Sequence, residues 1–353
     1  IMKLICGPMA TISHPAFRIL IEKFGGCDEY YTEMMNAGTL LTGGPFEKFY
    51  INPSPQPQKI VWQLTGHDTK NMVEAAKVLI KLPGIGLDIN MGCSAPDIYR
   101  FGAGIGWMLK PIEETREMVQ AIGQLIHNHN IENGDNKRFS VKLRLGDENF
   151  TDQSFYNFCD MLIENKVQLL TLHPRTKKEK LTRPARYFYC QELSKRYKNR
   201  GIPVYLNGNI KDKASYNHAL EVCPDVDGVM ISRAAVKNPW IFAQLKGLDI
   251  PEIDMKQLAF DYITDIQIYQ PKEFWKTRLQ RFFTYYSENF KFSHYAQTQF
   301  LNAKDIDEGI HNNIDNVAKE INNDAIVKHL VDQGKVKVVR AYYSLDGKVT
   351  FME

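Results

Sequence analysis

Several features that would identify a class of protein at once are missing from this chain. No apolar run approaches the roughly 18 residues that a membrane helix needs. The first residues lead straight into a predicted strand, so we expect no signal peptide. The cysteines show no CxxC spacing, which disfavours a zinc site or a disulfide framework; they are Cys6, Cys27, Cys93, Cys159, Cys190 and Cys223. We therefore expect a monomeric cytoplasmic protein with reduced thiols, no metal and no membrane contact.

The charge balance is also uninformative by itself. With 44 Lys and Arg against 41 Asp and Glu, the net charge of +3 is too small to identify a nucleic-acid-binding protein. It leaves room for a locally basic face, because positive and negative residues nearly cancel over the whole chain. The 353 residues are enough for about two domains.

Strand and helix patterns alternate over the first two thirds of the chain. The β-type runs cover 3–9, 29–35, 59–66, 85–93, 139–146, 167–176, 202–210 and 227–236. Apolar residues recur with helical spacing between most of them, and Asp68, Thr151 and Asp212 are expected helix N-caps. About eight β–α units predict a closed (β/α)₈ TIM barrel. An open doubly wound sheet is the alternative, but the Gly-rich run 102–106 does not directly follow a strand, as a dinucleotide fingerprint would.

The last third has a different composition. Residues 251–335 show helical patterns only, and the final residues alternate apolar and polar side chains around Asp346-Gly347, a strong hairpin signal. We therefore predict a catalytic barrel domain over 1–245. A smaller C-terminal helical domain over 246–353 would end in a β-hairpin.

Polar tips on all eight strands predict one active-site mouth at the carboxyl end of the barrel. One tip, NMGCS, carries Cys93. A buried packing cysteine is the common alternative. At a barrel mouth, however, the thiol can act as nucleophile or proton donor, and no histidine follows at a spacing that favours the nucleophile.

Basic residues and small residues mark three further tips. Lys142 and Arg144 share one face of their strand, and His173 and Arg175 share one face of the next. Helices should cover the outer face, so these side chains are expected to point into the mouth; exposed strand-end charges are the alternative. The tips 207–210 and 231–236, with Arg233, suit a phosphate, although a plain turn and a surface charge would read the same.

The ordered motifs resemble those of the tRNA-dihydrouridine synthases, in a divergent bacterial-type form. They are GPMATISHPAFRIL (7–20), YTEMM (31–35), QLTGHD (63–68), DINMGCSAP (88–96), VKLRLG (141–146), LHPRT (172–176), NGNI (207–210) and ISRAAVKNPWIF (231–242). The resemblance implies an FMN-binding barrel that uses NADPH (or NADH) as reductant. It implies an RNA substrate, tRNA foremost.

The resemblance also implies roles for single residues. Pro8 and Met9 would lie against the flavin ring. Polar atoms of the ring and ribityl chain would bond to Gln63, Lys142 and His173. The phosphate would be held by Asn207, Gly208, Asn209, Ser232 and Arg233. On the substrate side, Asn90 would contact the uracil, and Arg144 and Arg175 would help to seat the RNA.

The implied reaction is reduction of a uridine to 5,6-dihydrouridine. Hydride would reach carbon 6 of the uracil, and Cys93 would protonate carbon 5. Two departures from the family pattern predict a differently shaped loop around Cys93: the proline follows two places late, at Pro96, and a bulky Trp107 stands where small residues are usual. Ser232 likewise replaces a usual glycine.

The RNA-binding surface is less defined. One helical stripe in 271–292 is expected to be core rather than a stacking platform; it contains Trp275, Leu279, Phe282, Phe283 and Tyr286. Basic residues on its other faces are candidates for phosphate contacts: Lys272, Lys276, Arg278 and Arg281. A second basic cluster lies at the mouth, in 175–186.

Three other functions remain open at this point. The same reaction on ribosomal RNA is compatible with a divergent loop and tail. A small-molecule FMN oxidoreductase of the dihydroorotate dehydrogenase type would share Lys142, the phosphate site and a mouth cysteine. An RNA-binding module without catalysis is the third.

Overall fold

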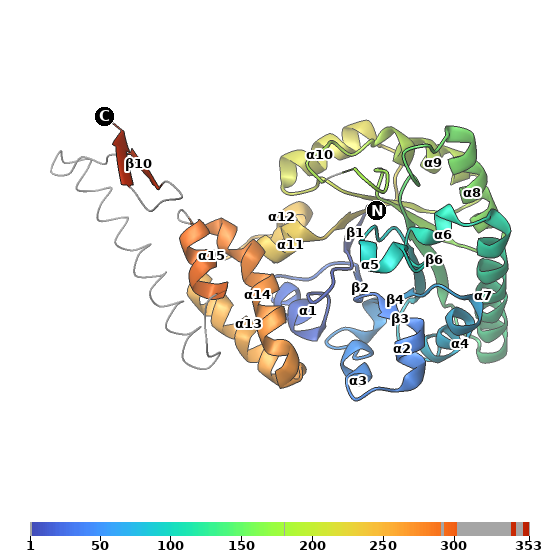
Figure 1. The fold of residues 1–353 in the computed structure, drawn as a ribbon, viewed down its shortest axis with the longest axis horizontal. Helices are drawn as coiled ribbons and strands as arrows, with labels where there is room; N and C mark the ends of the chain where they lie inside the picture. Colours follow the sequence, from blue (N-terminus) through green and yellow to red (C-terminus); the bar gives the residue numbers. More distant parts are fainter. Residues whose placement is uncertain (1, 180, 291–292, 302–339, 344–348, 353) are drawn as a thin grey trace.

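A closed barrel of parallel strands forms the larger part of the chain (Figure 1). The computed structural model describes residues 2–179, 181–290, 293–301, 340–343 and 349–352. The strands are β1 (Lys3–Cys6), β2 (Glu29–Tyr31), β3 (Met35–Asn36), β4 (Ile60–Thr65), β5 (Gly86–Met91), β6 (Arg138–Leu143), β7 (Leu169–Leu172), β8 (Val204–Asn207) and β9 (Gly228–Ile231). The sheet runs β2-β1-β9-β8-β7-β6-β5-β4, pairing of β2 with β4 closes it, and β3 adds a short extension on β4. The predicted TIM barrel is confirmed.

Helices connect the strands, and most of them surround the barrel (Figure 1). They are α1 (Pro15–Glu22), α2 (Ala37–Thr42), α3 (Glu47–Tyr50), η1 (Pro57–Lys59), α4 (Thr69–Leu79), α5 (Pro96–Tyr99), α6 (Gly106–Leu109), α7 (Ile112–Asn133), α8 (Asp152–Glu164), α9 (Phe188–Lys198), α10 (Lys213–Val222), α11 (Arg233–Lys237) and α12 (Ile241–Lys246). The expected caps are confirmed: Asp68 accepts a backbone hydrogen bond at the start of α4, and Thr151 and Asp212 form capping boxes. No helix among the described residues is long and apolar enough to cross a membrane.

Side-chain alternation gives the barrel two cores. On β6, Val141 and Leu143 are fully buried among residues that face the helices, so Lys142 between them points inward. The interior contains a separate apolar cluster with Val61 and Leu169, and the buried ion pair of Glu29 and Arg138 lies at the amino ends of β2 and β6. Toward the carboxyl ends the interior becomes polar, with Gln63, Asp88, Asn90, Ser140 and Thr171. This change of polarity defines the mouth.

The helical region lies against one side of the barrel, next to α1 and α11 (Figure 1). Its described elements are α13 (Met255–Tyr269), α14 (Lys272–Tyr286), η2 (Ser287–Asn289) and α15 (Ser293–Leu301). The expected apolar stripe on α14 is core: Leu279, Phe282, Phe283 and Tyr286 are buried and Trp275 packs against them. The domain division at residue 245 stays a prediction.

The predicted terminal hairpin is present as two antiparallel strands, β10 (Arg340–Tyr343) and β11 (Val349–Met352). The Asp346-Gly347 turn and the predicted helices beyond residue 301 lie outside the described residues.

One basic residue of α14 contradicts the sequence prediction. Arg278 was expected on an exposed face, but its side chain is buried and donates to both carboxylate oxygens of Glu33 at 3.1 and 3.0 Å. Its guanidinium also lies against the rings of Tyr50 and Phe274. The prediction was wrong because the partner comes from the loop after β2, far away in the sequence. Arg278 therefore joins the helical region to the barrel and is not available to RNA.

Candidate active site

The parallel register brings the predicted site residues to one end of the barrel. Gln63 on β4 lies opposite Asp88 on β5, and Asn90 on β5 lies opposite Lys142 on β6. Lys142 in turn lies opposite Thr171 on β7, two residues before His173. Strands β8 and β9 complete the circle with the tips after Asn207 and Ile231.

Cys93 differs from the other cysteines. It is half-buried in the loop after β5, whereas the other five are buried. The side-chain oxygen of Asn90 accepts the backbone N–H groups of Gly92 at 3.1 Å and Cys93 at 2.9 Å. Arg144 donates to the Gly92 carbonyl at 2.9 Å from the next strand. The thiol thus sits in a loop fixed from two sides and remains accessible.

A close backbone approach also shapes the Cys93 loop. Gly104 has φ +56°, and a Cβ at that position would lie 2.6 Å from the Cys93 carbonyl oxygen. Only glycine satisfies both the left-handed conformation and this spacing. Trp107 is buried beside it and donates through its indole N–H to the Gly66 carbonyl at 2.8 Å. The bulky residue that departs from the family pattern is therefore part of the support of the loop.

Lys142 is a cation without a close ion pair, although the Asp88 carboxylate is near it. Among the described residues its ammonium group makes no hydrogen bond or ion pair. Burial and the nearby Arg144 lower the pKa of Lys142 to about 8, against the opposing effect of Asp88, which raises it. A half-buried cation of this kind is suited to meet an anionic or electron-rich group of a ligand.

His173 and Arg175 form a second polar pair on the loop after β7. A guanidinium can only donate, so the hydrogen bond of 2.6 Å between Arg175 and Nε2 of His173 makes that nitrogen the acceptor. The ring proton then sits on Nδ1. Burial and the surrounding cations lower the pKa of His173 far below its usual value, so the ring is neutral.

Arg175 corrects another prediction. It was expected to contact RNA, but its side chain is fully buried. It donates to the backbone carbonyls of Leu181 and Arg183 and to the side-chain oxygen of Asn209 at 2.6 Å. The prediction failed because the acceptors lie on a loop that folds back over the strand. Arg175 organises that loop and does not lie on a surface.

The two tips predicted to hold a phosphate lie side by side, since β8 and β9 are paired. The Asn207 amide donates to the Met230 carbonyl at 3.0 Å. Gly208 has φ +126°, and a Cβ there would lie 3.0 Å from the His173 ring. Ser232 is half-buried, and its hydroxyl lies against Gly7, where a Cβ would collide with it. Small residues therefore leave backbone room at this corner of the mouth.

Four more predicted residues belong to this part of the site. Arg233 is exposed, and Asn209 adopts a left-handed conformation with φ +60°. Pro8 and Met9 follow β1 and are half-buried. The Met9 N–H donates to the Ser13 hydroxyl at 2.9 Å, so this group is already used within the chain.

The residues at the mouth fit a phosphate-bearing aromatic cofactor. An unpaired cation (Lys142), a neutral imidazole (His173), an amide (Gln63) and a small-residue corner with Arg233 surround one opening. Cationic and neutral polar groups of this kind suit an anionic ligand with hydrogen-bonding ring atoms. Among the described residues, no cluster of three or more His, Cys, Asp or Glu side chains is arranged to hold a metal ion.

Sequence reasoning missed two buried residues below the mouth. The Asp88 carboxylate is fully buried and bonds to the Gln63 amide at 2.8 Å and the Ser140 hydroxyl at 2.7 Å. The signal was available: Asp88 precedes Asn90 by two residues in a strand and must face the same side.

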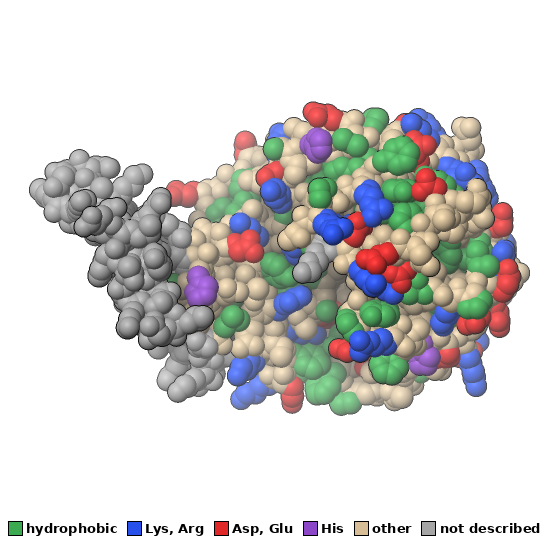
Figure 2. All heavy atoms as spheres, turned by 45° about the horizontal axis from the view of Figure 1, so that its top comes forward, with side chains coloured by type: hydrophobic (Ala, Val, Ile, Leu, Met, Phe, Trp, Pro, Cys, Tyr) green, Lys and Arg blue, Asp and Glu red, His purple; other side chains and the backbone are tan. Residues whose placement is uncertain are grey.

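The basic cluster at 175–186 is largely neutralised. Ion pairs join Lys177 to Asp147, Lys178 to Glu148 and Arg186 to Glu179. Figure 2 shows basic and acidic side chains next to one another over the barrel. Charge on this face therefore gives no separate argument for a polyanion.

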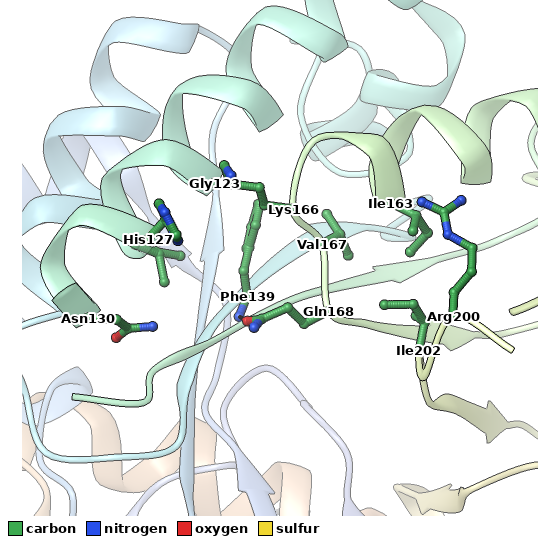
Figure 3. Close-up of a pocket in the computed structure, with 11 residues that line it drawn as sticks. Gly123, His127, Asn130, Phe139, Ile163, Lys166, Val167, Gln168, Arg200 and Ile202 are labelled. Carbon is green, nitrogen blue, oxygen red and sulfur yellow. Dashed lines mark hydrogen bonds between the residues drawn. The ribbon is translucent and has the colours of Figure 1, made fainter. Parts of the chain in front are cut away.

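A cavity of about 290 Å³ lies at the opposite end of the barrel (Figure 3). Residues of α7, the end of α8 and the loops before β7 and β8 surround it, with His127, Lys166 and Arg200 among them. These loops lead into the amino ends of the strands. The cavity is thus remote from Cys93 and Lys142 and belongs to the face of a barrel that usually serves stability.

The chain matches the dihydrouridine synthase (Dus) family over residues 4–332. A protein of Aquifex aeolicus named "Probable tRNA-dihydrouridine synthase" is 30% identical over 265 residues, which span 74% of this chain and 78% of that one. "Probable tRNA-dihydrouridine synthase 2" of Bacillus subtilis is 25% identical over 312 residues, 86% and 90% of the two chains. A Helicobacter pylori relative, also named "Probable tRNA-dihydrouridine synthase", is 27% identical over 262 residues, 73% of this chain and 75% of its own. The chain belongs to the dihydrouridine synthase family.

Proposed function

We propose that this protein reduces a specific uridine of tRNA to 5,6-dihydrouridine, with FMN as cofactor and NADPH as reductant. The observation that carries the proposal is the position of Cys93: it is the cysteine that is not buried among the six, and Asn90 and Arg144 hold its loop at the mouth beside Lys142. Membership in the family and the names of the relatives support the same reaction.

The mouth supplies plausible contacts for every part of FMN. Lys142, His173 and Gln63 would meet the ring and ribityl atoms. Asn207, Gly208, Asn209, Ser232 and Arg233 would surround the phosphate. Bound FMN, once reduced by NADPH, supplies the hydride that reaches carbon 6 of the uracil.

The chain itself handles the proton. The Cys93 thiol gives its proton to carbon 5, so hydride and proton together convert the uracil into neutral dihydrouracil and leave a thiolate on Cys93. Because Cys93 is half-exposed, solvent can return the proton between turnovers. The fixed loop holds the thiol in one position, and a general acid acts well only when its proton is aimed at the acceptor atom.

Asn90 is proposed to orient the uracil. Its amide nitrogen donates to the Gln63 oxygen at 3.0 Å and to the Met34 sulfur at 3.8 Å. Because a thioether sulfur is a weak acceptor, a substrate carbonyl would replace Met34 on the second N–H. The uracil must leave its stack to reach the mouth, which favours uridines in loops of folded RNA. The printed names of the relatives favour tRNA over ribosomal RNA. We place the enzyme in the cytoplasm as a monomer.

The decisive experiment compares RNA from cells with and without the gene. We expect dihydrouridine to disappear from one or a few tRNA positions in the deletion strain. The purified yellow protein should restore it in vitro with NADPH. Ribosomal RNA is sequenced in parallel, and a loss of dihydrouridine confined to it would identify ribosomal RNA as the substrate. Unchanged dihydrouridine in a strain without other family members would contradict the proposal, and turnover of free pyrimidines would favour a small-molecule oxidoreductase.

A further inference from the structure

A continuous chain of hydrogen bonds runs beneath the mouth from the barrel interior to the catalytic loop. The Ser140 hydroxyl donates to one oxygen of Asp88 at 2.7 Å, and the Gln63 amide donates to the other at 2.8 Å. The Asn90 amide donates to the Gln63 carbonyl oxygen at 3.0 Å. The remaining Asn90 oxygen accepts the backbone N–H of Cys93 at 2.9 Å. Three neighbouring strands thus connect to the cysteine loop.

The carboxylate of Asp88 gives this chain its direction. An ionised carboxylate only accepts, so Gln63 must turn its NH₂ group toward Asp88. The Gln63 oxygen is then the acceptor for Asn90, and Asn90 must turn its own NH₂ group toward Gln63. Its oxygen is left for the Gly92 and Cys93 N–H groups. The acid at one end and the Gly92 and Cys93 N–H groups at the other therefore favour the same orientation of both amides.

The reverse orientation would undo the loop. If Gln63 presented its oxygen to position 88, its NH₂ group would face Asn90, and Asn90 would answer with its oxygen. The Asn90 NH₂ group would then face the N–H groups of Gly92 and Cys93. Because all three groups are donors, no hydrogen bond could form between them. A buried N–H that loses its acceptor costs about 1–3 kcal/mol, so the loop would move away.

The burial of Asp88 is complete, and its surroundings are mixed in charge. Among the described residues it has hydrogen bonds but no ion pair within 4 Å. Lys142 and Arg138 on β6 face it as cations, and Tyr31 on β2 as a neutral phenol. Burial raises the pKa of Asp88 to about 6, against the opposing effect of Gln63, Ser140 and Lys142.

We propose that Asp88 is a positioning residue for Cys93: its carboxylate, acting through Gln63 and Asn90, fixes the loop that presents the thiol. The catalytic meaning of this role rests on the proposed function, but the positional role does not. It can be measured on the cysteine and its backbone directly.

The test uses Asp88→Asn, which keeps the shape but allows position 88 to donate. Ser140→Ala is the matched control, because it removes the other bond to the same carboxylate and leaves the direction of the chain intact. The first readout is the rate at which iodoacetamide alkylates Cys93, followed by mass spectrometry; the five buried cysteines give the background. The second is hydrogen exchange of the Gly92 and Cys93 amides.

We expect Asp88→Asn to change the alkylation rate at least threefold and to lose most of the exchange protection at residues 92 and 93. Uridine reduction should fall at least tenfold. At a pH well above the pKa of Asp88, which the Ser140 hydroxyl helps to keep low, Ser140→Ala should remain close to wild type in all three measurements. Wild-type rates of alkylation and exchange in Asp88→Asn would overturn the proposal, as would equal losses in both variants.

Two further measurements separate this inference from its premises. In the wild-type protein, protection at residues 92 and 93, corrected for intrinsic exchange, should be present above about pH 6 and be lost as Asp88 is protonated below it; a flat profile would overturn the proposal even if Asp88→Asn failed to fold. If the wild type reduces no uridine, the proposed function fails, yet alkylation and exchange still decide the role of Asp88.

Discussion

Two buried polar networks lie at opposite ends of the same barrel and are built in opposite ways. At the amino end, Glu29 accepts both terminal nitrogens of Arg138 at 2.9 and 2.6 Å and the hydroxyl of Tyr205 at 2.8 Å. At the carboxyl end, Lys142 makes no hydrogen bond or ion pair among the described residues, although Asp88 is near it. The second N–H of Asn90 has only the weak sulfur acceptor of Met34 at 3.8 Å.

The difference separates stabilising polar contacts from functional ones. At the amino end Glu29 and Arg138 neutralise each other, and the Nε of Arg138 is the one nitrogen of that guanidinium without a partner, so this network has no unpaired charge to offer a ligand. At the mouth, a cation and amide groups lack strong hydrogen-bond or ion-pair partners, which lowers the stability of the ligand-free protein. A ligand that forms hydrogen bonds or ion pairs with these groups recovers that cost as binding free energy. Breaking each network should therefore affect a different property.

The largest effect is expected at the mouth, from Cys93→Ala. Loss of a general acid typically slows a reaction by about 10²–10⁴-fold, so dihydrouridine formation should fall by that factor. Stability should hardly change, because Cys93 is half-exposed. Quantitative mass spectrometry of nucleosides after timed reactions with NADPH provides the measurement.

Cys190→Ala is the matched control, since this cysteine is on the fully buried face of α9. It should lower the unfolding temperature and leave the rate per folded molecule unchanged. Equal rates for Cys93→Ala and the wild type would remove Cys93 from the reaction.

The second effect belongs to the amino end. Glu29→Ala leaves the Arg138 guanidinium buried without a partner, and breaking a buried pair from one side costs about 3–5 kcal/mol in the free energy of unfolding. Denaturant titration measures this loss. FMN content per folded molecule should stay at the wild-type level, because the mouth is untouched.

Glu29→Leu combined with Arg138→Met is the control for that loss. Removing both charges together should recover most of the stability, because no charge is left unpaired. A single variant as stable as the wild type would show that the closed network contributes nothing.

Much of this comparison is visible in the sequence. The eight β–α units predict the barrel, and alternation predicts that Lys142 points inward, because both depend on patterns within a few residues. Arg278 and Arg175 were misjudged because their partners are remote: Glu33 lies 245 positions from Arg278, and Asn209 lies 34 positions from Arg175. A single sequence does not tell which loop will fold over an arginine.

Asp88 was missed for another reason. Alternation along the strand predicts that Asp88 faces the same side as Asn90. Its effect, however, depends on the directions of the hydrogen bonds through Gln63. Those directions are set only when three strands come into register. The same holds for the contrast between the two ends, since Glu29 and Arg138 meet only in the closed barrel.

A third, smaller effect tests whether catalysis depends on the position of the Cys93 loop. In Gly104→Ala the new Cβ would lie 2.6 Å from the Cys93 carbonyl oxygen, in a backbone conformation with φ +56°. A displacement of about 1 Å at a reacting group can cost roughly 10² in rate, so uridine reduction should fall by up to that factor. Steady-state rates at saturating RNA measure the loss.

Gly134→Ala is the matched control for the backbone. It has φ +62° with open space around the new Cβ. Both variants should lose about 1–2 kcal/mol from the left-handed conformation, and only Gly104→Ala should lose activity. If both keep the wild-type rate, the close approach of Gly104 to the Cys93 loop has no bearing on catalysis.

The smallest expected effect is an increase of stability with pH that comes from Lys142. The pKa of Lys142 is about 8 in the folded protein against 10.5 for an ordinary lysine, so between these values the unfolded chain binds more protons at this site. Stability of the FMN-free protein should therefore rise with pH across that window, and Lys142→Met should lack this increment. Lys178→Met should differ in the opposite direction, since Glu148 raises the pKa of Lys178 and its contribution is lost as pH rises through that value. Denaturant titrations from pH 7.5 to beyond 10.5 give both differences, that of Lys142 below and that of Lys178 above about 10.5. If stability rises with pH by the same amount in the wild type and in Lys142→Met, the charge of Lys142 is compensated within the protein, as the charges at the amino end are.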